Sequence, residues 1–209
     1  MIKRHFDRRF ALTGLAGVAA VIVTTHLGAN SRAPASLVEE FHASLMEVMH
    51  AAKALDFDGR YARLKPSIEN SFHLPVMMQI ATGSFWRKAS PKQKAQLIEV
   101  FSDVSVGTYA NRFSGFSGQW FQTKITRDGP RNTMLVDTIL KNPSNSDVAL
   151  TYVCLKIEGV WRIIDVLLDT GISELAVRRS EYSRILRSDG INGLIETLKR
   201  KALELRSPS

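Results

Sequence analysis

The sequence predicts an α+β domain in which helices cover one face of a curved antiparallel sheet. First, apolar residues recur every three or four positions between residues 36 and 109, which indicates helices. Second, four aromatic and β-branched segments follow between residues 119 and 168, and the short turns between them imply antiparallel neighbours. Third, two more helical patterns complete the chain. Helices packed across such a sheet enclose a space, so we expect an internal cavity.

Residues 1–35 have the pattern of an export signal. Four basic residues lie within the first nine positions, and residues 11–23 form an apolar run shorter than the roughly 20 residues of a membrane span. Ala33-Pro34-Ala35 matches an A-x-A cleavage pattern. A retained anchor is the alternative, and both the general secretory and the twin-arginine routes fit the residues. We predict an exported mature domain of residues 36–209.

The predicted mature domain carries little net charge. The whole chain has a formal charge of +8, but residues 36–209 contain 23 basic and 19 acidic residues. Its sequence has no aromatic-basic motif of the kind that binds nucleic acid, so we expect no nucleic-acid partner. A weakly basic exported domain would favour anionic lipid headgroups.

Capping motifs and prolines mark the first two predicted helices. Ser36-Leu37-Val38-Glu39 is a capping box, and an apolar stripe follows it to Leu55. A second, short helix begins near Phe57. We expect this helix to be interrupted around Pro66, because proline lacks the amide hydrogen that a helix interior requires.

The remaining elements follow in order. Pro75 opens a third helix that ends near Gly83, and the capping box Ser90-Pro91-Lys92-Gln93 opens a fourth that reaches Tyr109. Ser173 can cap the helix after the strands. The predicted strands cover residues 119–127, 133–141, 148–157 and 160–168, and the final helices cover residues 173–187 and 191–205.

The mature domain shows no motif for metal or cofactor chemistry. Its histidines, His42, His50 and His73, lack the i, i+4 spacing of a helical metal site, and Cys154 stands alone in a strand pattern. A lone cysteine at such a position behaves as a small buried apolar residue. We therefore predict no metal, no cofactor and no catalytic residue.

Carboxylates in the strands leave alternatives open. Asp165 and Asp169 stand among large apolar residues, and Asp137 lies in another strand. Each could accept hydrogen bonds from a nearby backbone or side-chain donor. A buried Asp165 could instead have a raised pKa and act as a general base with Asp137 as partner, or could contact a ligand headgroup.

Three segments of the predicted mature domain form an ordered set of short motifs. Trp86 to Gln93 is similar to "W-x-x-A-[ST]-P-x-Q" and is followed by Phe101 and by Thr108-Tyr109-Ala110. Trp161 to Val166 resembles "W-K-I-x-D-V" and is followed by Gly171-Ile172-Ser173 and by Arg178 to Tyr182. Gly190, Leu194-Ile195 and Leu198 resemble a terminal "G-x-x-x-L-I-x-x-L". In this order the motifs resemble those of the MlaC family of periplasmic lipid-binding proteins, also known as toluene-tolerance proteins.

The chain departs from the family pattern after the last strand. Leu168 to Glu174 replaces the frequent "V-E-G-V-S-L", and Ala176-Val177 replaces the Asn-Tyr before the arginine. These departures are typical of a divergent branch. A branch associated with hopanoid lipid gene clusters is one that this chain resembles.

The resemblance implies an NTF2-like fold, with a four-stranded sheet and helices enclosing an apolar pocket. Such proteins shuttle a phospholipid, or here a hopanoid-type lipid, through the periplasm between an outer-membrane lipid complex and an inner-membrane ABC transporter. This is binding without chemical turnover, and we expect a monomer. The alternatives are an NTF2-like enzyme that uses a buried Asp, and a transporter adaptor that carries no lipid.

Two sets of residues are candidates for lipid binding. Arg178 or Arg179 would pair with the phosphate at the mouth, and Ile164, Val166 and Leu168 would share one strand face by alternation. The apolar lining candidates are Met77, Met78, Phe101, Val104, Tyr109, Trp120, Leu135, Val153, Ile164, Val166 and Leu168.

Overall fold

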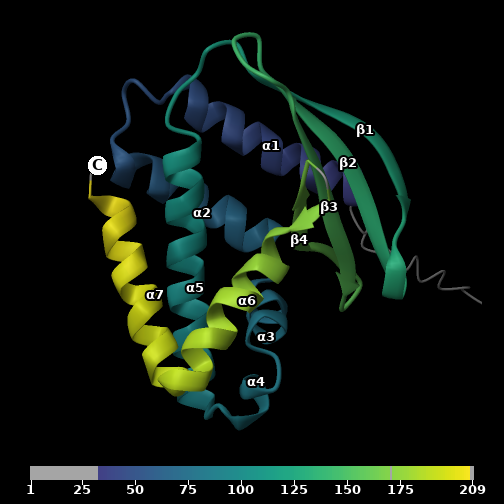
Figure 1. The fold of residues 1–209 in the computed structure, drawn as a ribbon. Helices are drawn as coiled ribbons and strands as arrows, with labels where there is room; N and C mark the ends of the chain where they lie inside the picture. The colour runs from purple at the N-terminus through teal and green to yellow at the C-terminus, as the bar shows by residue number, and fades with distance from the viewer. Residues whose placement is uncertain (1–32, 170, 208–209) are drawn as a thin grey trace, which may run out of the picture. The chain divides into compact units, whose positions relative to one another are not determined.

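A computed structural model describes residues 33–169 and 171–207 (Figure 1). Most of the predicted export signal, residues 1–35, lies outside the described residues. The helices are α1 (Pro34–His50), α2 (Phe57–Ser71), α3 (Leu74–Thr82), α4 (Phe85–Lys88), α5 (Pro91–Arg112), α6 (Glu174–Ser188) and α7 (Gly190–Arg206). The strands are β1 (Trp120–Asp128), β2 (Thr133–Lys141), β3 (Val148–Ile157), β4 (Val160–Leu168) and β5 (Ile172–Ser173).

The strands form one antiparallel sheet in the order β1-β2-β3-β4-β5. The predicted α+β architecture and four-strand meander are confirmed, and the two-residue β5 is an addition that the sequence analysis did not foresee. Register shifts at Lys124 in β1 and at Ile164 in β4 place one extra residue in each strand. Such bulges increase the twist of a sheet, which suits the curvature seen in Figure 1.

The helices build a second layer against the sheet. Helix α1 packs on β1, β2 and β4, α7 lies along α5, and α3 lies along α6 (Figure 1). The largest fully buried side chains include Phe41 of α1, Phe101 of α5 and Tyr152 of β3. In the part of the chain that the structure describes, no helix is both long and apolar enough to span a membrane.

Three predictions about the first two helices are wrong. Helix α1 begins at Pro34 after Ala33, so Ser36 lies inside the first turn and cannot serve as the N-cap. It ends at His50, before the predicted Leu55. Helix α2 continues through Pro66. Pro66 and Ala62 are exposed, so water can satisfy the Ala62 carbonyl that proline leaves without a partner, while buried Leu64 and Ile68 hold the helix to the core.

The second predicted capping box is confirmed. The Gln93 amide donates to Ser90 Oγ at 3.2 Å, and the Ser90 amide donates to Gln93 Oε1 at 3.0 Å. The Gln93 side chain also donates to Asn192 Oδ1 at 2.9 Å, which ties the start of α5 to α7. Cys154 is fully buried as predicted, and burial raises the pKa of its thiol to about 12.

Candidate functional site

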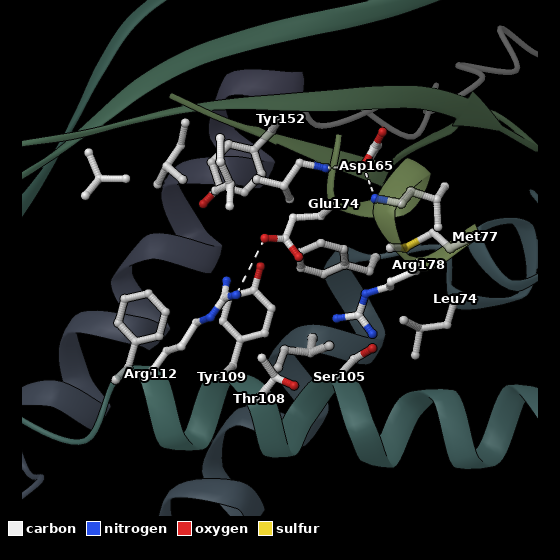
Figure 2. A pocket seen from close by; sticks show the side chains of 18 of the residues that line it. Leu74, Met77, Ser105, Thr108, Tyr109, Arg112, Tyr152, Asp165, Glu174 and Arg178 are labelled. Carbon is white, nitrogen blue, oxygen red and sulfur yellow. Dashed lines mark hydrogen bonds and ion pairs between the residues drawn. The ribbon is translucent and has the colours of Figure 1, made fainter. Parts of the chain in front are cut away.

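A cavity of about 270 Å³ lies between the sheet and helices α3, α5 and α6 (Figure 2). The volume is near the lower end of the range of about 300–1,000 Å³ that is typical of ligand pockets. Most of its wall is apolar, with a few polar groups among the apolar side chains. The lining residues are Ile68, Phe72, Leu74, Met77, Ser105, Thr108, Tyr109, Arg112, Phe113, Leu140, Val148, Leu150, Tyr152, Asp165, Val166, Leu168, Glu174, Leu175 and Arg178.

Three of the four charged residues of the lining come from α5 and α6, and the fourth, Asp165, comes from β4. Arg112 Nη2 lies 3.5 Å from Glu174 Oε1, and the Arg178 guanidinium lies over the Phe101 ring, 5.3 Å from its centroid. The Tyr109 side chain extends from α5 into the cavity in Figure 2. Burial raises the pKa of Tyr109, nearby Arg112 and Arg178 oppose that shift, and Glu174 adds to it. The Tyr109 phenol therefore stays neutral although three charged side chains lie near it.

A buried histidine supports the cavity from behind. His42 Nε2 shares a 2.9 Å hydrogen bond with the Tyr152 hydroxyl, and the His42 ring stacks on Phe121 with a centroid distance of 3.8 Å. His42 is only 4% exposed, and burial lowers its pKa to about 3. The neutral imidazole thus fixes the position of a tyrosine whose ring lines the cavity.

We expect His42 to make the fold sensitive to acid. Its pKa rises from about 3 in the folded state to 6.5 on unfolding, so the unfolded chain binds the proton more tightly. The contribution of neutral His42 to the free energy of unfolding is therefore fully present above pH 6.5 and decreases as the pH falls toward 3. Between pH 7 and pH 5 the free energy of unfolding should fall by about 2 kcal/mol through this group.

Urea unfolding of the wild type and of His42→Gln at both pH values would measure this effect. The variant should lose the His42 share of the pH dependence. His50→Gln, which changes an exposed histidine on the same helix, is the control. An equal pH dependence in the wild type and in His42→Gln would contradict the expectation.

Asp165 connects the end of the sheet to α6. Its carboxylate accepts hydrogen bonds from the Val166 amide at 2.8 Å, the Leu175 amide at 3.0 Å and the Ser173 hydroxyl. Ser173 Oγ in turn caps α6 by accepting from the Ala176 amide at 2.8 Å, as predicted. Both carboxylate oxygens of Asp165 therefore have partners, which agrees with the structural interpretation of this residue.

Asp137 and Asp169 also accept hydrogen bonds, away from the cavity lining. Asp137 receives two from Arg127, at 2.8 and 3.2 Å, and one from the Thr151 hydroxyl at 2.7 Å. The hydrogen bond from Arg127 is the main reason why the pKa of Asp137 is lowered. Asp169 accepts from the Ala149 amide at 3.2 Å. Asp165 lines the cavity and Asp137 does not.

The structure brings part of the predicted set to the cavity. Met77, Tyr109, Val166, Leu168 and Arg178 line it. The other candidates lie elsewhere: Met78, Phe101, Val104, Leu135 and Ile164 are buried in the core, Val153 is half-buried, Trp120 is 51% exposed, and Arg179 is exposed.

The bulge in β4 explains why Ile164 is separated from Val166 and Leu168. Val153 pairs with Asp165 and Cys154 pairs with Ile163, so Ile164 is the extra residue and the alternation of faces restarts after it. The prediction that these three side chains share one face is wrong at Ile164. A bulge depends on the register with the neighbouring strand, which the sequence of β4 alone does not specify.

Sequence reasoning missed several lining residues, among them Ser105, Thr108 and Arg112 of α5. These positions lie with Tyr109 on one helix face, because they follow one another at helical spacing. A polar stripe on an otherwise buried helix was therefore visible in the sequence. Glu174 and Leu150 had no comparable local signal. Among the residues that the structure describes, no three His, Cys, Asp or Glu side chains group as a metal site.

Comparison with known proteins assigns the chain to a protein family and finds a solved structure with the same fold. The MlaC protein family model matches residues 39–200. A solved structure of a phospholipid-binding protein from Ralstonia solanacearum, in complex with a phospholipid, has the same fold with a TM-score of 0.73. The two chains are 20% identical over 83% of this chain and 99% of that one. Because the family model covers well over half of the chain, the chain belongs to the MlaC family.

Proposed function

We propose that this protein binds a phospholipid in the cavity and carries it through the periplasm without chemical change. The observation that carries the proposal is the apolar cavity between sheet and helices in a member of the MlaC family. The similar Ralstonia protein was solved with a phospholipid. A hopanoid-type lipid is the second cargo that the test below distinguishes.

The physical chemistry of the cavity suits a carrier. A diacyl lipid has roughly 30 methylene groups, and each one that leaves water contributes about 0.8 kcal/mol. Such a lipid is larger than a cavity of about 270 Å³, so the proposal requires the walls to move apart as the chains enter. Met77 is an adaptable part of this wall, because a thioether side chain fills spaces of different shape.

The wider role follows from the same proposal. A monomeric carrier would take lipid from one membrane and release it at the other, with an outer-membrane lipid complex and an inner-membrane ABC transporter as its partners. The export pattern of residues 1–35 would bring the domain to the periplasm. The family resemblance supports both the proposed membrane partners and the proposed periplasmic location.

Native mass spectrometry of the protein purified from a bacterial periplasm tests the proposal. We expect a monomer with one added lipid mass per chain, and solvent extraction should identify a phospholipid or a hopanoid. A bare protein mass, together with no uptake from phospholipid vesicles, would contradict the carrier and favour the adaptor.

A further inference from the structure

Two arginines of the cavity wall differ in how their charge is balanced. Arg112 at the end of α5 pairs with Glu174 at the start of α6. Arg178, one turn further along α6, has no carboxylate partner among the described residues. It is half-buried and lies over the Phe101 ring. The wall therefore has two guanidinium groups and two carboxylates: Glu174 pairs with Arg112, Asp165 accepts from the Val166 and Leu175 amides and the Ser173 hydroxyl, and neither carboxylate pairs with Arg178.

An uncompensated guanidinium beside an apolar cavity favours an anion there. Partial burial weakens its solvation, and an incoming anion would restore a favourable partner. The planar guanidinium also matches the geometry of phosphate oxygens better than an ammonium group does. Ser105 and Thr108 border the same part of the cavity (Figure 2), so hydroxyl groups lie next to this charge.

The start of α6 is not itself the anion site. The Leu175 amide already donates to Asp165, and the Ala176 amide already donates to Ser173. The protein's own side chains therefore satisfy amides that a bound anion could have used. An anion in the cavity would depend on the arginine side chains.

The contact between Arg112 and Glu174 is weak enough to exchange. Its charged atoms are 3.5 Å apart, and the two side chains are 55% and 29% exposed. Partly exposed ion pairs of this length contribute little to stability. Glu174 also lies in the first turn of α6, where the helix dipole stabilises a carboxylate that has lost its partner.

We propose that Arg112 and Arg178 bind the anionic headgroup of the lipid and that Glu174 is an internal competitor which the headgroup displaces from Arg112. This inference rests on the proposed lipid-carrier function. Arg112, Arg178 and Glu174 together carry one net positive charge when ionised, and the Asp165 carboxylate is held by its own donors at the start of α6. The arginine pair therefore matches a headgroup with one net negative charge better than a zwitterionic one. When the lipid leaves, Glu174 returns to Arg112 and lowers the cost of an empty site.

Lipid uptake from vesicles of two compositions tests this inference. Delipidated protein is incubated with phosphatidylglycerol or phosphatidylcholine vesicles, separated from them, and weighed by native mass spectrometry. Glu174→Gln should raise the affinity for phosphatidylglycerol about threefold to tenfold and change that for phosphatidylcholine little. Arg178→Gln should lower the affinity for phosphatidylglycerol about tenfold, a typical effect of losing one charge-assisted contact.

Matched controls come from the same helix. Glu181→Gln and Arg179→Gln make the same charge changes at exposed positions outside the cavity lining, so they report the effect of net charge on vesicle attraction. Arg178→Lys keeps the charge but loses the planar fork, and should fall between the wild type and Arg178→Gln. Palmitate offered in place of vesicles tests a free fatty-acid carboxylate as the source of the anion.

The outcomes separate the two proposals. If Glu174→Gln and Arg178→Gln affect uptake no more than their exposed controls, the headgroup site is wrong while lipid carriage stands. If the wild type takes up neither phospholipid, the carrier function itself fails. Uptake of palmitate alone, with the same response to both variants, would keep the anion site and assign it to a fatty acid instead of a phospholipid.

Discussion

Replacing Thr108 by tryptophan is expected to abolish lipid binding while leaving the domain folded. Thr108 lies half-buried on α5 and borders the cavity (Figure 2), so a larger side chain projects into space that the acyl chains would use. Each excluded methylene group removes about 0.8 kcal/mol. Exclusion of about five therefore costs roughly 4 kcal/mol, or about a thousandfold in affinity.

The measurement is the fraction of chains that carry lipid in native mass spectra. It should fall from near one to near zero in Thr108→Trp. Ala95→Trp is the matched control, because Ala95 is exposed on the same helix and does not line the cavity. The melting temperature of each variant shows whether the new side chain strains the core, since overpacking typically costs about 1–3 kcal/mol. Lipid retained at full occupancy by a folded Thr108→Trp would place the ligand outside this cavity.

Replacing Asp165 by alanine is expected to destabilise the domain by about 2–4 kcal/mol. The substitution removes the acceptor of the Val166 amide, the Leu175 amide and the Ser173 hydroxyl at the point where β4 leads into α6. These donors lie in a part-buried region, so water replaces the lost partner incompletely. Chemical unfolding at neutral pH would measure the change.

Asp137→Ala is the control for this prediction. Asp137 also accepts three hydrogen bonds in a strand, but its charged partner Arg127 is half-exposed, and an exposed pair contributes less than about 1 kcal/mol. Equal losses for the two variants would contradict the special role of Asp165. Asp165→Asn also separates the carrier from an acid-base enzyme. A carrier with this substitution should fold and still bind lipid, whereas an enzyme that uses Asp165 as its base would lose its turnover.

The order and type of the elements followed from the sequence. Aromatic and β-branched runs with short turns predicted β1 to β4 to within one residue, because alternation and turn residues act locally. The capping box at Ser90 and the cap at Ser173 formed for the same reason. The wrong expectation at Pro66 shows the limit of local rules, since burial of the residues on either side decided that helix.

The residues that line the cavity could be predicted only in part from the sequence. Met77, Tyr109, Val166, Leu168 and Arg178 could be selected as apolar or basic residues in suitable patterns. Their neighbours in the core have the same residue types and the same periodicity, and a pattern cannot tell a wall that faces a cavity from one that faces another side chain. Only packing makes that distinction.

The sequence by itself determined the fold class and the family, because these depend on periodicity and on short motifs. The tertiary structure decided where the cavity lies, which face Ile164 takes, and that Glu174 reaches Arg112 from another helix. The physical reason is that strand register and helix packing join residues that are distant in the chain. The charge balance at a site depends on which of those residues meet.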